Sequence, residues 1–209
     1  MPIICLFGPD ASGKSTLARA LVEELRRRGF KARSSWMRGT HTLASLIARL
    51  LSRFDALKGT DNPYYQIAIP KSLRRLWQLL EFSSALPVVL FRFVIPSALG
   101  YWVVADRYVT DLVAWVSVTT RDHDYVRRGE GRFLLALASR ARVKVYVTAA
   151  LEELIKRREA SSRFLNEQIE VYERIAPIVR AKKLDTTNKG ADDSVREVLS
   201  LLNVMGASS

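Results

Sequence analysis

Two spacings of hydrophobic residues alternate along this chain. Short segments, most of them apolar, are typical of buried strands and occur at 2–7, 30–36, 101–105, 143–147 and 182–185. Between them, apolar residues recur every three to four positions, which is the spacing of amphipathic helices. The predicted helices cover 14–28, 42–54, 64–83, 88–99, 109–119, 130–140, 151–159, 164–180 and 191–203. This alternation predicts an α/β sandwich of three layers, a five-stranded parallel sheet with helices on both faces.

The first predicted strand leads into Gly8-Pro9-Asp10-Ala11-Ser12-Gly13-Lys14-Ser15-Thr16, which contains the pattern G-x-x-x-x-G-K-S. Between a strand and a helix, this pattern indicates a phosphate-binding P-loop. Its glycines let the backbone turn N–H groups toward phosphate oxygens, and the helix adds its positive end. We expect Lys14 to reach the β- and γ-phosphates and Ser15 to offer its hydroxyl to Mg²⁺. The predicted ATP-binding residues are Gly8, Asp10, Ala11, Ser12, Gly13, Lys14, Ser15 and Thr16.

The length of 209 residues suits a single P-loop domain over 1–209. The only cysteine, Cys5, excludes a disulfide within the chain, which favours a reducing, cytoplasmic setting. The first apolar run is too short for a secretory signal peptide. The net charge of +12 is compatible with nucleic acid or with anionic small molecules. Because the arginines are scattered over the predicted helices, we expect no nucleic-acid partner.

The segment 86–104 is largely apolar, and its composition is similar to that of a membrane-spanning helix. Arg92 in its middle, together with Pro87, Pro96 and Gly100, argues against a lipid-embedded helix. We therefore predict a buried helix at 88–99 and no membrane partner. This helix is apolar on more than one face, and a monomer rarely exposes such a patch. We expect a homodimer through it, with Arg92 near the rim of the interface.

Asp106 and Arg107 follow a predicted strand directly. Ligands of parallel sheets bind at the carboxyl ends of the strands, where the P-loop and the segment 36–38 also fall. An acid at that edge is suited to hold a metal-bound water, and an arginine beside it is suited to take a phosphate. The alternative is an arginine–carboxylate pair that only supports the fold.

These segments together resemble the thymidylate kinase family of P-loop nucleoside monophosphate kinases. The resemblance rests on G-x-D-x-x-G-K-S-T, on D-R-Y about ninety residues later, and on arginines before the penultimate helix. It implies transfer of the γ-phosphoryl group of ATP to dTMP or a related nucleoside monophosphate, giving the diphosphate. It also implies a homodimer and a short lid at about 157–164 that moves on binding.

The resemblance assigns the acceptor site residue by residue. Asp10 matches the acid that contacts the sugar hydroxyl, and Arg38 matches the arginine that grips the acceptor phosphate. Phe82 matches the aromatic residue that stacks on the base, and Trp115 falls at a further aromatic position. Arg107 also lies on the acceptor side.

The resemblance likewise assigns the transfer machinery. Asp106 and Arg107 match the pair beside the phosphates, with Asp106 and Ser15 as the metal-binding residues. Because Ala11 replaces a P-loop arginine found in some members, the lid is expected to supply that charge. The predicted catalytic residues are Lys14, Asp106, Arg107, Arg157, Arg158 and Arg163.

Three departures from the family pattern leave the accepted base open. The family shows F-x-x-x-R, but Leu86 follows Phe82 where the base-reading arginine is expected. The family's R-E-P segment reads Arg38-Gly39-Thr40 here, and Asp111 stands where a serine is usual. Discrimination between bases depends on paired polar contacts. A kinase for a nucleoside or another small metabolite is therefore an alternative, and a non-enzymatic ATP-dependent switch or nucleic-acid-binding module is a third.

Overall fold

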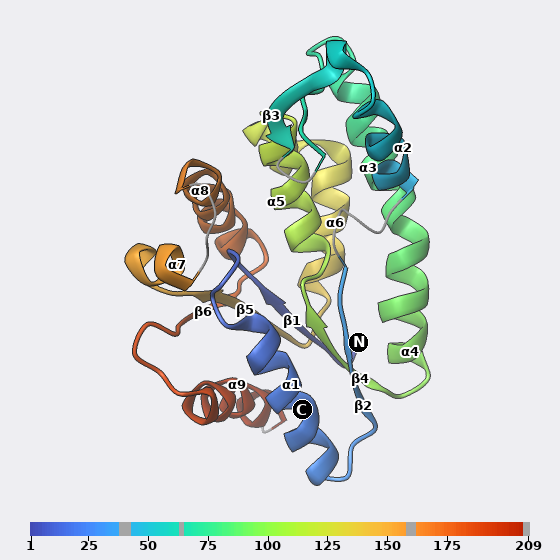
Figure 1. Ribbon diagram of the computed structural model, residues 1–209. Coiled ribbons are helices and arrows are strands. Elements are labelled where there is room, and N and C mark those ends of the chain that lie inside the picture. Colours follow the sequence, from blue (N-terminus) through green and yellow to red (C-terminus); the bar gives the residue numbers. More distant parts are fainter. Residues whose placement is uncertain (38–42, 63–64, 158–161, 207–209) are drawn as a thin grey trace.

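The sheet forms the centre of the molecule in this computed structural model, which describes residues 1–37, 43–62, 65–157 and 162–206 (Figure 1). Its strand order is β2-β4-β1-β5-β6 and all neighbouring pairs are parallel, which confirms the predicted five-stranded parallel sheet. The central strand β1 is buried along its whole length. The strands are β1 (Ile3–Phe7), β2 (Ala32–Ser35), β4 (Trp102–Asp106), β5 (Val143–Thr148) and β6 (Lys182–Asp185).

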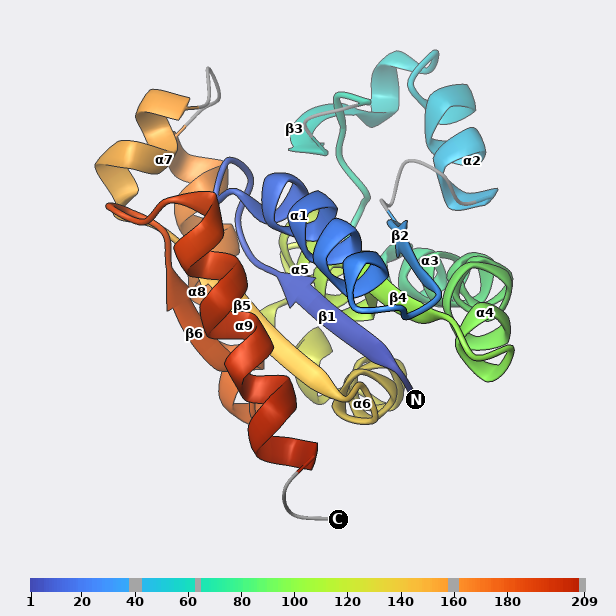
Figure 2. The ribbon, with the colours of Figure 1, turned by 90° about the horizontal axis from the view of Figure 1, so that it is seen from below.

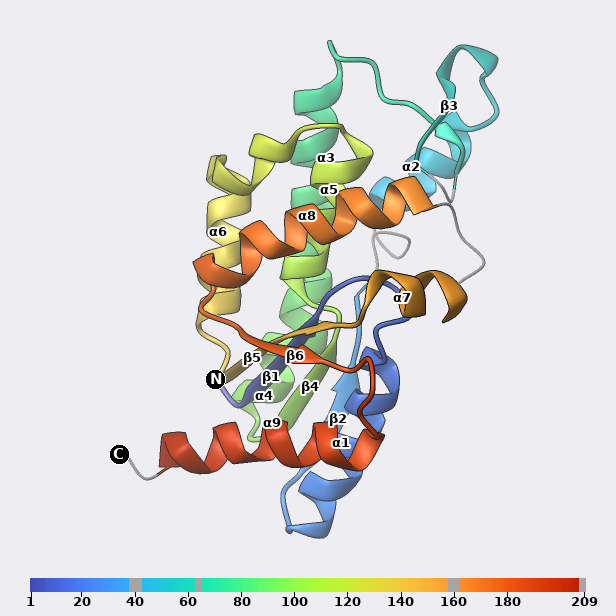
Figure 3. The ribbon, with the colours of Figure 1, turned by 90° about the vertical axis from the view of Figure 1, so that its left-hand side faces the viewer.

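Helices cover both faces of the sheet, as Figure 3 shows for α8 and α9 on opposite sides. One face packs against α1 (Lys14–Arg27) and α9 (Ala191–Gly206), whose leucines and valines form one hydrophobic cluster with the strands. The other face carries a larger cluster. The helices that contribute to it include α3 (Arg74–Val89), α5 (Val109–Thr119), α6 (Gly129–Ser139) and α8 (Ser162–Ile178). The short helix α4 (Ile95–Ala98) contacts β4.

The helix α5 is buried on every side, since all of its residues from Val109 to Thr119 are buried. Helices α6 and α8 pack against it, and the 3-10 turn His123–Arg127 follows it. This burial explains why its sequence is apolar around the whole helix rather than along one stripe. The helix follows Asp106 and Arg107 in the chain, so a rigid, fully packed element supports the predicted phosphate-binding edge.

The predicted helix over 64–83 begins outside the described residues, and it is wrong over 65–73, since α3 begins at Arg74. Before it, β3 (Lys58–Asn62) lies outside the main sheet, and its two ends bridge Ile67 in antiparallel fashion. The side chain of Asn62 accepts a hydrogen bond from the backbone N–H of Tyr65 at 3.1 Å. Asparagine in a turn competes with helix formation in this way.

The predicted break between 83 and 88 is also wrong. The chain continues from α3 through a π-helical segment, Leu90–Val94, into α4, although Pro87 lies inside α3. In the π segment the N–H of Ile95 bonds to the carbonyl of Leu90, five residues back. Proline removes one helical hydrogen bond, and a π segment changes the register by one residue, which lets the helix continue.

The combined helix Arg74–Ala98 is long and apolar enough to cross a membrane by length and composition alone. Its most apolar stretch has a mean hydropathy of 1.6 and is 28% buried. The predicted buried helix at 88–99 is therefore wrong in its burial, since Leu90, Phe91 and Leu99 are exposed. Only one side of this segment packs on the rest of the fold, through residues such as Val89 and Phe93.

The remaining elements extend beyond the carboxyl ends of the strands. Figures 1 and 2 show α2 (Leu43–Leu51) and β3 to one side of this edge and α7 (Leu151–Arg157) to the other. A single 3-10 turn, Asp55–Leu57, joins α2 to β3. The edge that carries the P-loop is therefore flanked by segments from distant parts of the chain.

Candidate active site

The P-loop follows β1 and ends where α1 begins, as the motif predicts. A side chain at Gly8 would bring a Cβ atom to 2.1 Å from the carbonyl oxygen of Val147, so only glycine fits against β5. At the other end, Gly13 has a φ of +87° and is the N-cap of α1. Between them, Ala11 also has a positive φ of 65°, an unusual conformation for a residue with a side chain. The loop backbone is thus held in a curled shape that suits phosphate.

Lys14 folds back over this loop and is only 3% exposed. Its ammonium group donates hydrogen bonds to the carbonyl of Pro9 and, at 3.1 Å, to the hydroxyl of Ser12. Burial, together with the nearby positive charge of Arg107, lowers the pKa of Lys14 to about 8, against the opposing charges of three aspartates. The lysine therefore occupies the loop at a point where an anion would stabilise its charged form.

Arg107 joins β4 to the P-loop. Its guanidinium forms a close ion pair with Asp10, which lies 97 positions earlier in the chain. A second carboxylate, Asp111, lies 3.8 Å from the other guanidinium nitrogen. Burial alone would lower the pKa of Arg107, but the charges of Asp10 and Asp111 outweigh it and raise the pKa. Arg107 has a φ of 75°, so backbone strain is concentrated where β4 turns into α5.

Asp111 is itself held from two directions. Its Oδ2 accepts a hydrogen bond from the backbone N–H of Tyr108 at 3.1 Å, within a capping box of α5. Its Oδ1 accepts a hydrogen bond from the hydroxyl of Tyr172 on α8 at 2.9 Å. Burial raises the pKa of Asp111, and the charges of Arg107 and Lys14 oppose that rise. The serine-to-aspartate departure noted in the sequence thus ties α8 to Arg107.

Asp106 and Ser15 fit the way proteins hold Mg²⁺ beside a nucleotide. The Oδ1 atom of Asp106 is buried and has no hydrogen-bond partner among the residues that the structure describes. Ser15 is exposed at the start of α1. The described part of the chain contains no cluster of three or more His, Cys, Asp or Glu side chains for an all-protein metal site. Mg²⁺ commonly binds through one or two carboxylates together with substrate phosphates, so this sparse donor set fits it.

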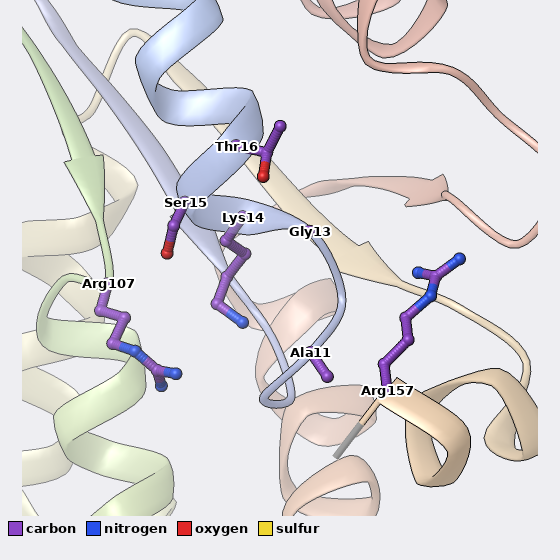
Figure 4. Close-up of a pocket in the computed structure, with 7 residues that line it drawn as sticks. All are labelled: Ala11, Gly13, Lys14, Ser15, Thr16, Arg107 and Arg157. Atoms are coloured by element: carbon purple, nitrogen blue, oxygen red, sulfur yellow. The ribbon is translucent and has the colours of Figure 1, made fainter.

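A cavity of about 430 Å³ lies over the P-loop, between Arg107 and Arg157. Figure 4 shows these two arginines on opposite sides of Lys14, with Arg107 directed toward it. Arg157 is the last residue of α7, and its Nε lies 3.3 Å from Glu153. Sites of this size hold small ligands. The residues that line it are Ala11, Gly13, Lys14, Ser15, Thr16, Arg107 and Arg157.

The other predicted residues lie elsewhere. Phe82 packs edge-on against Phe133 of α6, with ring centroids 5.8 Å apart, and it does not line this cavity. Trp115 contacts the ring of Phe164 on α8 edge-on at 6.3 Å. Two predicted residues, Arg38 and Arg158, lie outside the described residues. The side chain of Arg163, in the first turn of α8, is also outside the described part of the chain.

Glu81, a buried acid on α3, is a residue that the sequence patterns did not single out. Burial raises its pKa to about 8, while hydrogen bonding from Trp115 and Trp77 opposes that rise. The sequence contains a feature that could have pointed to it, because Glu81 is the only charged residue between Arg75 and Arg92. Tyr172 was missed as well. It lies in the region expected to be helical, but nothing in its neighbourhood along the chain points to Asp111.

The five-stranded parallel sheet, with the P-loop between β1 and α1, defines the chain as an α/β protein with a phosphate-binding loop. Among solved structures it is similar to thymidylate kinase from Candida albicans, with a TM-score of 0.65 over 98% of this chain and 92% of that chain. The sequence identity is 16%, so the likeness is one of fold. The Candida enzyme is described as having broad substrate specificity and a novel structural element. No family model and no curated protein matches the chain. The chain has a thymidylate kinase-like fold.

Proposed function

We propose that the chain is a nucleoside monophosphate kinase that transfers the γ-phosphoryl group of ATP to dTMP or a related nucleoside monophosphate. The observation that carries this proposal is the ion pair between Arg107 and Asp10 beside the cavity over the P-loop. It brings Arg107, which directly follows β4 and would bind the acceptor phosphate, next to the loop that would hold the donor nucleotide. A binding protein for ATP alone has no need of this second anion site.

The chain's own residues would act mainly by positioning charge. The P-loop N–H groups and Lys14 would hold the β- and γ-phosphates of ATP. Arg107 would hold the acceptor phosphate, and Asp10 would face the acceptor's sugar. Mg²⁺, held by Ser15 and by Asp106 through water, would neutralise charge on the donor phosphates when bound. Arg157 faces the cavity from the opposite side to Arg107, where it could meet charge on the transferring group.

The experiment that tests this proposal is a coupled assay of ADP formation with a panel of acceptors. The panel contains nucleoside monophosphates, nucleosides and small phosphorylated metabolites, with ATP and Mg²⁺ throughout. ADP formation that depends on a nucleoside monophosphate supports the proposal. Transfer only to another class of acceptor, or ATP hydrolysis that no acceptor stimulates, overturns it.

One observation favours the second candidate, a P-loop kinase for a nucleoside or another small metabolite. Arg107 already contacts two carboxylates, Asp10 and Asp111, so part of its charge is neutralised before any acceptor binds. An acceptor without a phosphate would have less need of a free guanidinium. The panel separates the two candidates, because it contains nucleosides and their monophosphates side by side.

We further propose a homodimer through the helix that runs from α3 into α4. Large apolar side chains stand exposed along it, with Phe91 67% exposed and Leu99 69% exposed. A monomer rarely exposes a contiguous apolar patch of this kind, and a second copy presents the same patch in a two-fold interface. Arg92 donates a hydrogen bond to the carbonyl of Trp36 at 3.0 Å, which holds it beside this surface.

We also propose one domain over 1–209, a lid at about 157–164, and a cytoplasmic enzyme.

A further inference from the structure

The helix α2 packs with small side chains inward and large apolar side chains outward. Ala44 and Ala48 are buried against α3, in a hydrophobic cluster that is separate from the two clusters on the sheet. Leu43, Leu46 and Leu50 are between 55% and 61% exposed, and we call them the leucine face. A surface helix of a globular protein ordinarily turns its large apolar residues toward the core. The reversed arrangement in α2 therefore needs an explanation.

The leucine face is a continuous stripe on the outside of the molecule. Its members are three or four residues apart, so they lie on one side of α2. Directly after the helix, the N–H of Phe54 bonds to the carbonyl of Leu51 at 3.0 Å, and the exposed Phe54 ring adds to the apolar surface. Figures 1 and 2 show α2 beside α3, beyond the carboxyl ends of the strands. This face is therefore open to a partner that has an apolar interior.

Two arginines border the leucine face, and both are exposed. Arg49 follows Leu46 by three residues, and Arg53 follows Leu50 by the same interval, so each lies next to a leucine. Among the described residues, neither guanidinium has an ion pair or a hydrogen bond. The stretch 43–54 contains no acidic residue, and the chain carries a net charge of +12. The partner of this face is therefore expected to be negatively charged.

The surface of an anionic lipid bilayer meets both requirements. Acyl chains can take up the leucines, and negatively charged headgroups can meet the arginines, whose long side chains reach the headgroup level. A second copy of the chain fits less well, because a two-fold interface centred on this face would bring the same arginines together. Charge complementarity thus favours the bilayer over self-association.

We propose that α2 binds the surface of an anionic bilayer, with the leucine face at the boundary between headgroups and acyl chains. Arg49 and Arg53 contact the negatively charged headgroups. The helix has nine residues and is about 14 Å long, so it lies along the surface and cannot cross a hydrocarbon layer of about 30 Å. The expectation of no membrane partner concerned a spanning helix at 86–104 and is a different matter. The inference does not rest on the proposed function, because the leucine face shares no residue with the cavity over the P-loop.

Vesicle flotation tests the proposal with two kinds of vesicle. One kind is phosphatidylcholine alone, and the other contains about one part phosphatidylglycerol to two parts phosphatidylcholine. We expect the wild-type protein to bind the anionic vesicles at least roughly tenfold more tightly than the neutral ones, and added salt to weaken this binding.

Two variants separate the apolar contribution from the charged one. The double variant Leu46→Glu with Leu50→Glu is expected to lose at least roughly tenfold in affinity for the anionic vesicles. Arg49→Gln is expected to lose roughly fivefold on anionic vesicles and nothing on neutral ones. Ile178→Glu is the matched control, because Ile178 is 50% exposed at the end of α8, away from α2 (Figure 3). Circular dichroism confirms that each variant is folded.

A labelled protein gives a second measurement that needs no charge at the leucine face. In Leu50→Cys, an environment-sensitive nitrobenzoxadiazole dye attaches to position 50, because the only native cysteine, Cys5, is buried. The dye emits more strongly in an apolar environment. Its emission is expected to rise with anionic vesicles and to stay constant with neutral ones. This measurement decides if the double variant does not fold.

The opposite results would overturn the proposal. If the wild-type protein binds neither kind of vesicle, or binds both equally, the inference fails. If the double variant binds anionic vesicles as the wild-type protein does, another surface holds the bilayer, and the inference fails. If the double variant also sediments as a smaller species than the wild-type protein, the leucine face is an interface between copies of the chain. The panel of acceptors tests the proposed function separately, so either can fail alone.

Discussion

The hydroxyl of Tyr172 donates a hydrogen bond of 2.9 Å to Asp111, and the same carboxylate oxygen lies 3.8 Å from the guanidinium of Arg107. Burial and the neighbouring charge of Asp111 raise the pKa of Tyr172, so the hydroxyl keeps its proton and continues to donate. Tyr172 belongs to α8, the helix that follows the segment expected to form the lid. This contact therefore links α8 to the arginine expected to hold the acceptor.

The Tyr172→Phe variant is expected to raise the KM for the acceptor several-fold, with a smaller effect on kcat. Without the hydroxyl, Asp111 loses one of its partners and holds Arg107 less firmly. Tyr125→Phe is the matched control, because the Tyr125 hydroxyl is also buried but has no hydrogen-bond partner among the described residues. Steady-state kinetics on both variants test the link. An unchanged KM in Tyr172→Phe, or an equal rise in Tyr125→Phe, would contradict it.

The Lys14→Ala variant is expected to abolish phosphoryl transfer and leave the protein folded. The lysine bonds to its own loop rather than to the core, so its loss leaves no large cavity. Circular dichroism and the transfer assay are measured on the same sample. Normal circular dichroism together with a near-normal rate of phosphoryl transfer would show that Lys14 is not needed for the reaction.

Binding of ATP is expected to take up protons at about pH 8. Burial lowers the pKa of Lys14 to about 8 in the free protein, and the phosphates of ATP stabilise its charged form and raise that pKa. Between the two pKa values the free lysine is partly neutral and the bound lysine is charged, so binding takes up protons and weakens as the pH rises further. Isothermal titration calorimetry in two buffers of different ionisation enthalpy measures the uptake. In Lys14→Arg the uptake should vanish, because arginine does not titrate in this range. Equal uptake in both proteins would assign it to another group.

The Arg107→Ala variant is expected to lose about 2–4 kcal/mol of transition-state stabilisation, as for the removal of one preorganised charge. The loss should appear mainly in acceptor binding, and ATP affinity should change little. Arg127→Ala is a control, since Arg127 lies in the turn after α5 and does not line the cavity over the P-loop. Equal losses of affinity for ATP and for the acceptor would show that Arg107 does not belong to the acceptor site.

The Phe91→Glu variant is expected to convert the dimer into a monomer. Phe91 is exposed in the π-helical segment, and two like charges facing each other across a two-fold axis would repel. Phe30→Glu is the control, because Phe30 is exposed near the end of α1 and packs against Trp102 instead. Sedimentation velocity at micromolar concentration compares the three proteins. A wild-type monomer would refute the dimer.

Much of the fold could be predicted from local sequence. The bounds of α5 and β6 agree with the prediction, because α5 is an apolar segment directly after a predicted strand and β6 lies between two predicted helices. The P-loop was equally clear, since its glycines and Lys14 lie within nine consecutive residues. The single helix that includes Pro87 was not, because a proline ordinarily ends a helix and only the π-helical register shift after it lets the chain continue.

The sequence by itself determined the alternation of strands and helices, the phosphate-binding loop, and the acid and arginine after β4. These depend on neighbours in the chain, through backbone propensity and the period of apolar residues. Only the tertiary structure decided that Arg107 meets Asp10, that Tyr172 meets Asp111, and that Phe82 packs against Phe133. These pairs join residues far apart in sequence. Which face of a long apolar helix turns inward depends on the helices that pack against it.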